Sequence, residues 1–482
     1  MSCTLESITS IVDKAASLVW GIPLIVAILS TGILLSVMLG FRHILNIGNA
    51  FRYIFHKGHG HHGEVSAFAA LCTALSATIG TGNIVGVATA ITTGGPGALF
   101  WMEVAAFFGM ATKYAEGLLA VKYRHIAPDG RVLGGPFYYI ERGLGPKWKP
   151  LAVVFAIFGI GTGLFGIGTL AQVHGISSAV QRFFDPSFNP ADPASGVTVF
   201  GCTVSVAAMI AGAVVTICAG LVIIGGLKRI AKVSMVIVPF MAISYVAVCL
   251  LVIIGNFDKL PQAIMLIVKA AFNPAAVTGG AVGTIFIAMQ KGIARGIFSN
   301  EAGLGSEPIA AAAAKTNEPA KQGLVSMTGT FIDTIVICTM TGLTIVLSGA
   351  WDPALGLQGV HLTIEAFSRG ISFIPGAAAI VPFFMMSALT FFAFTTILGW
   401  DFYSEKCLEY LIGMHRQGIV KAYRLLYVAI VAAGPYLSIS LIWSLADVVN
   451  GLMAFPNLIA LILLSPVVVR VTRDFLSRQK EA

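Results

Sequence analysis

Apolar segments of about 20 residues recur from one end of this chain to the other, and no long polar block separates them. A segment of about 20 apolar residues crosses the hydrocarbon core of a bilayer as an α-helix, which bonds its backbone polar groups internally. The pattern therefore predicts an all-α polytopic membrane protein with about 11 transmembrane helices. The predicted spans are 18–41, 66–93, 97–122, 150–180, 199–226, 232–254, 278–299, 324–349, 376–399, 424–444 and 447–469.

The composition excludes a soluble protein. Only 11% of the 482 residues are charged and 57% are hydrophobic, whereas soluble domains carry about 25% charged residues. The seven cysteines form no CxxC pair, so neither a disulfide framework nor a zinc site is indicated. The net charge of +8 reflects basic loops on one side of the membrane rather than binding to nucleic acid.

The basic residues alternate from side to side along the chain. Most of them lie in the loops 42–65, 123–149, 227–231, 300–323 and 400–423 and in the tail 470–482. The opposite side carries few, namely Lys14, Arg182, Lys259, Lys269 and Arg369. Because loops rich in Lys and Arg stay in the cytoplasm, we expect the N-terminus outside and the C-terminus inside. An odd number of spans agrees with this topology.

Two apolar spans are interrupted by glycine and polar residues. The second span contains SATIGTGN at 76–83, and the seventh contains MQKGIARG at 289–296. Gly82 and Gly86 also fit close helix packing through a small-xxx-small contact, which is the alternative interpretation. A pair of broken helices is favoured by position, because the interrupted spans are the first and sixth of ten once the first helix is set aside. This spacing is typical of a 5+5 inverted repeat.

The chain accordingly divides into three predicted parts. Residues 1–65 form an extra N-terminal helix with a cytoplasmic loop, 66–254 form the first five-helix repeat, and 255–482 form the second repeat and the cytoplasmic tail. The two repeats would have opposite orientations in the membrane because each contains five spans.

A broken helix exposes amides that suit a carboxylate and carbonyls that suit a cation. The amides of Thr81 and Gly82 are placed to meet a carboxylate, and the Asn83 side chain can serve either ligand. Thr395 and Thr396 form an adjacent hydroxyl pair at similar depth, which suits a small hard cation such as sodium. A lone Thr in a membrane helix usually bonds its own backbone instead.

Other polar side chains occur at membrane depth. Lys113 and Glu116 are three residues apart and could pair on one helix face. An unpaired charge in a span is costly. Asp333 is therefore expected either to be paired in a structural role or to take part in ion coupling. The chain contains no GxxxxGK[ST] sequence and no catalytic Ser/His/Asp or HExxH arrangement within the spans. We therefore expect neither an enzyme nor a direct use of ATP.

Three blocks of sequence resemble the alanine or glycine:cation symporter family, the sodium:alanine symporters. They are TIGTGNIVGVA at 78–88 followed by GGPGALFWM at 94–102, then GIARGIFSNEAG at 292–303, and TILGW at 396–400. The resemblance implies a leucine-transporter-type fold with spans two to eleven as its ten-helix core. It also implies sodium-coupled uptake of a small neutral amino acid, alanine or glycine, into a cell across the plasma (bacterial inner) membrane.

The resemblance further implies roles for individual residues. Thr81 and Gly82 would hold the substrate carboxylate, with Gln172, Thr396 and Trp400 near its amino group and side chain, and Asn83 as a weaker candidate. The sodium ion would be held by the carbonyls of Ser76 and Ile79 and by the hydroxyls of Thr395 and Thr396. One departure occurs in the fourth span, where GTLAQVH at 168–174 replaces the Gly-Asn-rich stretch that the family has before the Gln.

The expected partners are the amino acid, sodium as a co-transported substrate, and membrane lipid, with no cofactor and no nucleic acid. A proton-coupled amino-acid symporter is the alternative function. A channel is a further alternative, although it would need a continuous polar or carbonyl-lined pore.

Overall fold

The computed structural model describes residues 2–55, 63–190, 192–199, 202–273, 284–437 and 439–481. In these residues nearly all of the regular structure is helical, and two short antiparallel hairpins accompany the helices. The helices of the N-terminal half are α1 (Ser2–Val19), α2 (Ile22–Met38), α3 (Arg42–Leu45), α4 (Ile47–Phe55), α5 (Ala67–Thr78), η1 (Gly82–Gly86), α6 (Val87–Gly94), α7 (Gly97–Tyr123), α8 (Pro136–Tyr138), η2 (Tyr139–Leu144), η3 (Pro146–Trp148), α9 (Lys149–Phe165), α10 (Leu170–Phe184), η4 (Pro193–Ser195), α11 (Val206–Ile223) and α12 (Gly226–Gly255).

The second half continues in the same style. Its helices are η5 (Phe257–Lys259), α13 (Leu260–Phe272), α15 (Ile285–Asn300), α16 (Glu307–Ala311), α17 (Pro319–Thr330), η6 (Phe331–Cys338), α18 (Thr339–Leu347), η7 (Pro353–Leu355), α19 (Gly359–Gly370), η8 (Ala377–Ala379), α20 (Val381–Ile412), α21 (Gln417–Ala433), η9 (Gly434–Tyr436) and α22 (Ile439–Glu481). In the hairpins, β1 (His125–Ile126) pairs with β2 (Val132–Leu133), and β3 (Val197–Val199) pairs with β4 (Cys202–Val204).

The predicted spans agree with these helices. Within the described ranges, nine helical stretches are long and apolar enough to cross a membrane, and the bent pair Ala67–Thr78 and Gly82–Gly94 raises the number to ten. The remaining predicted span, 278–299, overlaps α15, and its first residues lie outside the described part of the chain. The predicted polytopic all-α architecture is therefore confirmed.

Several predicted boundaries are wrong by 7 to 13 residues. The fifth span begins at Val206 because the hairpin β3–β4 precedes it. The ninth continues to Ile412, so Trp400 lies inside α20 and not at the end of a span. The tenth span already ends at Ala433 and the last begins at Ile439, so they do not separate at 445–446 as predicted. Apolar composition locates a span but marks its ends poorly, since helices extend into the interface.

The outer surface carries an apolar stripe suited to lipid. On α11, Val206, Ile210, Val214, Ile217 and Leu221 recur every three or four residues and are more than half exposed. A soluble protein rarely exposes a contiguous apolar face of this kind. The stripe therefore supports burial of α11 in a bilayer.

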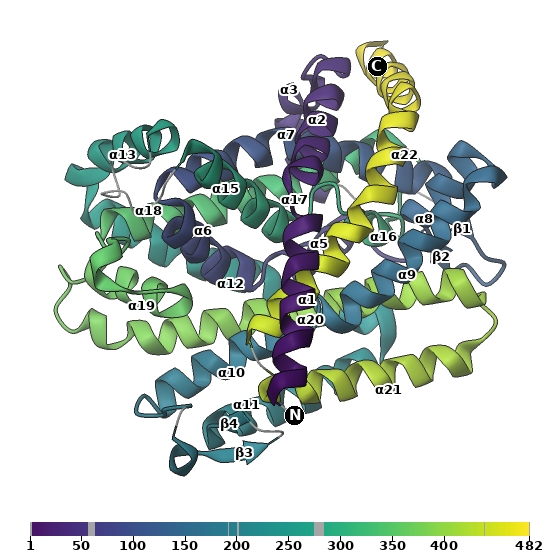
Figure 1. Ribbon diagram of the computed structural model, residues 1–482. Helices are drawn as coiled ribbons and strands as arrows, with labels where there is room; N and C mark the ends of the chain where they lie inside the picture. Colours follow the sequence, from purple (N-terminus) through teal and green to yellow (C-terminus); the bar gives the residue numbers. More distant parts are fainter. Residues whose placement is uncertain are drawn as a thin grey trace.

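The long helix α20 runs through the molecule from one end to the other (Figure 1). Helices α13 and α19 lie toward one end of α20, and α8 with the hairpin β1–β2 lies toward the other, where the turn into α21 also occurs. Helix α7 packs against α15 and α17 in the interior. The candidate site lies where α5, η1, α10, α15 and α20 meet.

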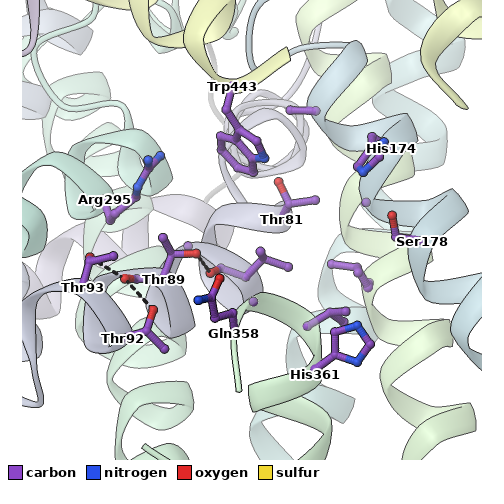
Figure 2. A pocket seen from close by; sticks show the side chains of 17 residues that line it. Thr81, Thr89, Thr92, Thr93, His174, Ser178, Arg295, Gln358, His361 and Trp443 are labelled. Carbon is purple, nitrogen blue, oxygen red and sulfur yellow. Dashed lines mark hydrogen bonds between the residues drawn. The ribbon is translucent and has the colours of Figure 1, made fainter. Parts of the chain in front are cut away.

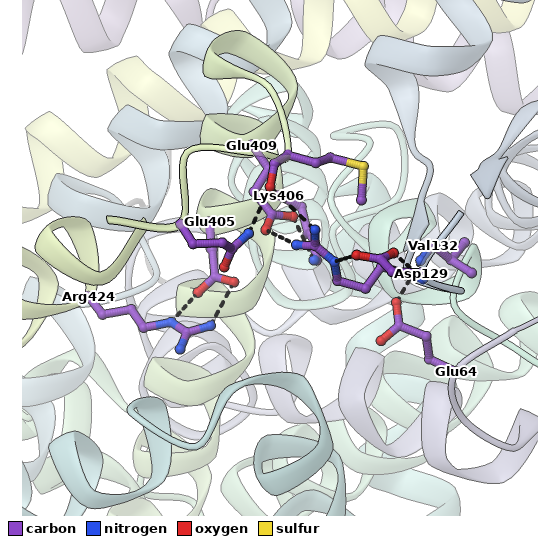
Figure 3. Close-up of polar contacts among 10 residues, drawn as sticks. Glu64, Asp129, Val132, Glu405, Lys406, Glu409 and Arg424 are labelled. Atoms are coloured by element: carbon purple, nitrogen blue, oxygen red, sulfur yellow. Dashed lines mark hydrogen bonds and ion pairs between the residues drawn. The ribbon is translucent and has the colours of Figure 1, made fainter. Parts of the chain in front are cut away.

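At the β1–β2 end, charged side chains join three elements (Figure 3). Arg131 in the hairpin lies 3.6 Å from Glu409 of α20, and Lys406 lies 2.7 Å from the same glutamate. Arg424 of α21 binds Glu405 through two hydrogen bonds of 2.6 and 2.9 Å. These contacts hold the C-terminal end of α20 against the hairpin and α21.

Candidate functional site

The second span is broken where the sequence predicts a break. Helix α5 ends at Thr78, and α5 and the segment Gly82–Gly94 meet at 52°. The last helical bond runs from Ile79 N to Leu75 O, while the next amide, Gly80 N, donates to Asn83 Oδ1 at 2.9 Å. The helical series therefore stops before reaching the carbonyl of Ser76, and the last carbonyls of α5 are released for other partners.

Gly80 is the point at which this backbone approaches two other helices. A Cβ built on Gly80 would lie 2.6 Å from Thr396 Oγ1 and 3.1 Å from Gln172 Oε1. With glycine at this position, Thr396 Oγ1 lies 3.3 Å from Ile79 O, and Thr81 N donates to Gln172 Oε1 at 3.1 Å. Only a residue without a side chain permits both contacts, so the glycine is required by close approach.

The two adjacent threonines of α20 face different neighbours. Thr396 reaches Ile79 O in the break. The Thr395 hydroxyl bonds its own helix at Phe391 O and Phe392 O, and its nearest partner on another helix is Met241 Sδ at 3.7 Å. Thr396 therefore contacts the broken helix directly, and Thr395 lies against α12.

Asn83 fixes the break to the eighth span. Its Oδ1 accepts from Gly80 N, and its Nδ2 donates to Asp333 Oδ1 at 2.7 Å and to Asp333 O at 3.1 Å. The other carboxylate oxygen, Asp333 Oδ2, accepts from Ser299 Oγ at 2.8 Å and from Thr334 Oγ1 at 2.7 Å. Asp333 thus joins η1, α15 and η6, which satisfies this fully buried carboxylate.

A cavity of about 460 Å³ opens beside the break (Figure 2). Thr81 lies at its wall, and the Thr81 hydroxyl is buried without a hydrogen-bond partner. His174 of α10 also lines the cavity, with a buried Nδ1 that has no partner. Two residues that line the cavity thus each have a polar atom without a partner, which leaves bonding capacity for a polar ligand at the cavity wall.

Aromatic and basic side chains line the same cavity. Arg295 of α15 lies over the ring of Trp443, 5.2 Å from its centroid, and 3.9 Å from Asp447 on α22. His361 lies on the wall formed by α19, and its pKa is lowered by burial and by the nearby Arg182. His361 is therefore neutral near pH 7, whereas Arg295 places a positive charge at the cavity wall.

The seventh span departs from the prediction. Helix α15 is continuous across 289–296, and the chain leaves the helix only at Glu301, which has a φ of 57°. Gly292 and Gly296 face α7, where added Cβ atoms would meet Ala98 and Met102, so they serve close helix packing. The interruption lies at 301–306, where Gly303 and Gly305 also adopt positive φ.

Trp400 lies next to this second break. Its side chain is 1% exposed, and its Nε1 donates to Glu301 Oε1 at 2.9 Å. Gly168, between α9 and α10, packs against the Trp400 side chain closely enough that a Cβ would clash. Trp400 therefore joins α20 to the second break and to the interruption of the fourth span.

The structure brings most of the predicted site residues into one region, but only Thr81 of the substrate set lines the cavity. Gly82 packs against Ser299, Gln172 bonds Thr81 N and Ile167 O, and the Ser76 hydroxyl bonds Thr73 O. Arg295 and Trp443 are not among the site residues predicted from the sequence. A basic residue inside an apolar span is itself a functional signal, and Arg295 could have been identified from it.

The predicted pairing of Lys113 with Glu116 is wrong. Lys113 Nζ lies 2.7 Å from Glu307 of α16, and Glu116 Oε1 accepts from Asn457 Nδ2 at 2.6 Å. Helical spacing gives neighbours on one helix, whereas these side chains find partners on other helices.

The sequence and fold were compared with known proteins. The profile of the Sodium:alanine symporter family matches residues 5–482. The Sodium/alanine symporter AgcS of Methanococcus maripaludis is 46% identical over 472 residues, covering 97% of both chains. A "Putative sodium/proton-dependent alanine carrier protein", YrbD of Bacillus subtilis, is 36% identical and covers 97% of this chain and 93% of its own.

Among solved structures, the fold is similar to MhsT in complex with L-phenylalanine. The TM-score is 0.55 at 12% sequence identity, covering 87% of this chain and 100% of MhsT. This similarity confirms the leucine-transporter-type fold. Since the family profile spans nearly the whole sequence, this chain is a member of the sodium:alanine symporter family.

Proposed function

We propose that this protein is a secondary active symporter that couples sodium entry to the uptake of a small neutral amino acid, alanine or glycine, by alternating access. One observation carries the proposal beyond family membership. The released end of α5 meets the Thr396 hydroxyl at Ile79 O, 3.3 Å away, and the adjoining residue Thr81 lines the cavity. A cation site beside a cavity for an amino acid is what cation-coupled transport requires.

The sodium ion, as a transported substrate, is assigned to neutral oxygen ligands. These are the carbonyls of Ser76 and Ile79 and the hydroxyls of Thr395 and Thr396. Hard cations prefer oxygen ligands, and the released carbonyls at the end of α5 provide the negative end of a helix dipole. The contact between Ile79 and Thr396 supports this set, with Thr396 as its central side chain.

The amino acid is assigned to the first break and its neighbours. Thr81 and Gly82 would receive the carboxylate, with Gln172, Thr396 and Trp400 toward the amino group and side chain. Asn83 belongs to this set because it fixes the conformation of the break. Its Oδ1 accepts from Gly80 N, and its Nδ2 donates to Asp333. In the present arrangement Gln172 Oε1 accepts from Thr81 N, so a bound carboxylate would replace this glutamine at the amide.

The protein would lie in the plasma (bacterial inner) membrane with its N-terminus outside and its C-terminus in the cytoplasm. The asymmetry of basic residues supports this orientation.

Uptake in proteoliposomes tests the function. Labelled alanine should accumulate under an inward sodium gradient and should not accumulate under lithium or proton gradients of equal size. Accumulation driven by protons alone would favour the proton-coupled alternative. The name of the relative YrbD includes both sodium and proton dependence. Equilibration without accumulation would indicate a channel. Competition by unlabelled glycine, alanine and leucine defines the substrate.

A further inference from the structure

Four ionisable side chains gather beneath the second break, outside the proposed substrate and sodium sites. Lys113 and Glu116 come from α7, Glu301 begins the break, and Glu307 begins α16. Each of these residues is at most 2% exposed. Arg295 on the cavity wall precedes Glu301 by six residues, or about 9 Å of helix, so the cluster lies beyond the cavity along α15.

The charges in this cluster do not balance. Three carboxylates face one ammonium, and full ionisation would leave two buried negative charges without a counter-charge. The other groups within electrostatic range do not compensate: Asp333 of η6 interacts with Glu301 and Lys113, Tyr139 of η2 with Glu116, and Tyr403 of α20 with Glu301 and Glu307. An uncompensated buried charge costs several kcal/mol, so the cluster requires a further positive charge.

The hydrogen bonds identify where that charge belongs. Both oxygens of Glu301 accept, from Trp400 Nε1 and from the Ser306 hydroxyl. Glu307 has one oxygen, Oε1, without a partner, but its Oε2 has the Lys113 ammonium at 2.7 Å. Glu116 has one donor, Asn457 Nδ2 at 2.6 Å, and its Oε2 is buried with no partner. The Tyr403 hydroxyl, also buried and without a partner, is an independent sign of unused bonding capacity from α20.

We propose that Glu116 binds a proton in this closed arrangement and exchanges it with water when the second break opens. Within the described part of the chain Glu116 has no cation in contact with it, and a neutral carboxylic acid tolerates burial where a carboxylate with one bare oxygen and no ion pair does not. Asn457 connects the acid to the break, because its Nδ2 also donates to Gly303 O at 2.9 Å. Deprotonation places a second uncompensated charge beside this loop and favours the state in which water reaches it.

The first experiment measures stability against pH and does not depend on the transported substrate. Thermal unfolding of the purified wild-type protein is compared with that of Glu116→Gln, which keeps an oxygen acceptor for Asn457 but cannot titrate. A proton held in the folded state stabilises it at low pH and is lost as pH rises. Between mildly acidic and mildly alkaline pH, the wild-type melting temperature should fall by several degrees more than that of Glu116→Gln.

Glu365→Gln is the matched control, because Glu365 is half exposed and pairs with Arg369 on the surface. It should keep the wild-type pH profile. Glu116→Asp, which retains a titratable carboxyl, should keep a pH-dependent melting temperature even if the protein is less stable. Identical pH profiles for wild type and Glu116→Gln would overturn the proposal.

The second experiment rests on the proposed function. Alanine exchange in proteoliposomes, with equal pH and sodium on both sides, should slow as pH rises, and the pH dependence should disappear in Glu116→Gln. If no variant exchanges alanine at any pH, the proposed function fails, and the melting profiles still decide the proton site. Exchange by Glu116→Gln with an unchanged pH dependence would place the proton elsewhere.

Discussion

At the residue scale, the contacts of the first break are possible because Gly80 has no Cβ. Gly80 lets the broken backbone approach Thr396 and Gln172. Thr396 and Thr395 differ in sequence position by one, yet one contacts the break and the other contacts α12. The two hydroxyls thus have different surroundings, and mutating each threonine separately tests their roles.

Thr396→Val should raise the sodium concentration needed for half-maximal uptake by roughly 5- to 30-fold, because it removes a proposed ligand worth about 1–2 kcal/mol without changing shape. Thr395→Val should raise it by less, since Thr395 makes no direct contact with the break. Thr390→Val serves as the control, because the Thr390 hydroxyl bonds its own helix at Met386 O. Unchanged sodium dependence in both Thr396 and Thr395 variants would disprove the assignment.

Trp400 offers a test of substrate size. Trp400→Leu should shift preference toward leucine relative to alanine under the proposed placement of Trp400 beside the substrate side chain. The shorter side chain leaves apolar space there, and each methylene admitted is worth roughly 1–3 kcal/mol. Trp400→Phe keeps an aromatic ring but loses the bond to Glu301. If competition by leucine is unchanged in Trp400→Leu, Trp400 acts only in holding the second break.

At the element scale, the two broken helices are held by different means. The first break is bridged by the Asn83 side chain, which replaces a lost helical bond at Gly80 N and binds Asp333 on another span. The second is bridged by Asn457, Trp400 and Ser306, which bond Gly303 and Glu301. In each break an asparagine side chain bonds a backbone group that the helix no longer satisfies, Gly80 N in the first and Gly303 O in the second.

Asn83→Asp should destabilise the protein by about 1–3 kcal/mol, since it removes the amide donor to Asp333 and places two carboxylates together. The double variant Asn83→Asp with Asp333→Asn should recover part of this loss, because one donor and one carboxylate face each other again. Chemical or thermal unfolding measures the effect. Additive losses in the double variant would show that the two residues do not interact.

At the scale of the whole molecule, α20 connects the end that carries α13 and α19 to the end that carries the β1–β2 hairpin. The cavity reaches residues of α19, such as His361, at one end. The ion pairs of Arg131, Lys406 and Arg424 close around α20 at the other end (Figure 3). The cavity and these ion pairs therefore lie toward opposite ends of α20.

The orientation can be tested by cysteine accessibility in a background without native cysteines. Lys147 and Lys259 are exposed and lie in loops that the charge pattern assigns to opposite sides. An impermeant thiol reagent added to intact cells should label Lys259→Cys and spare Lys147→Cys. The reverse pattern of labelling would show that the topology is inverted.

The amino-acid sequence by itself determined the polytopic helical architecture and the first break. Apolar length is a local property, and Gly80 with its polar neighbours cannot continue a membrane helix without other partners. The three sequence blocks also identified the family that the profile confirms.

Only the tertiary structure decided which side chains meet. The glycines of 292–296 could mark either a break or close packing, and contact with α7 decided for packing. Lys113 could pair along its own helix, but Glu307 lies 2.7 Å away on α16. The physical reason is the same in both cases: inside a membrane, a polar or small residue is explained by the neighbouring helix that it faces, and that neighbour is distant in sequence.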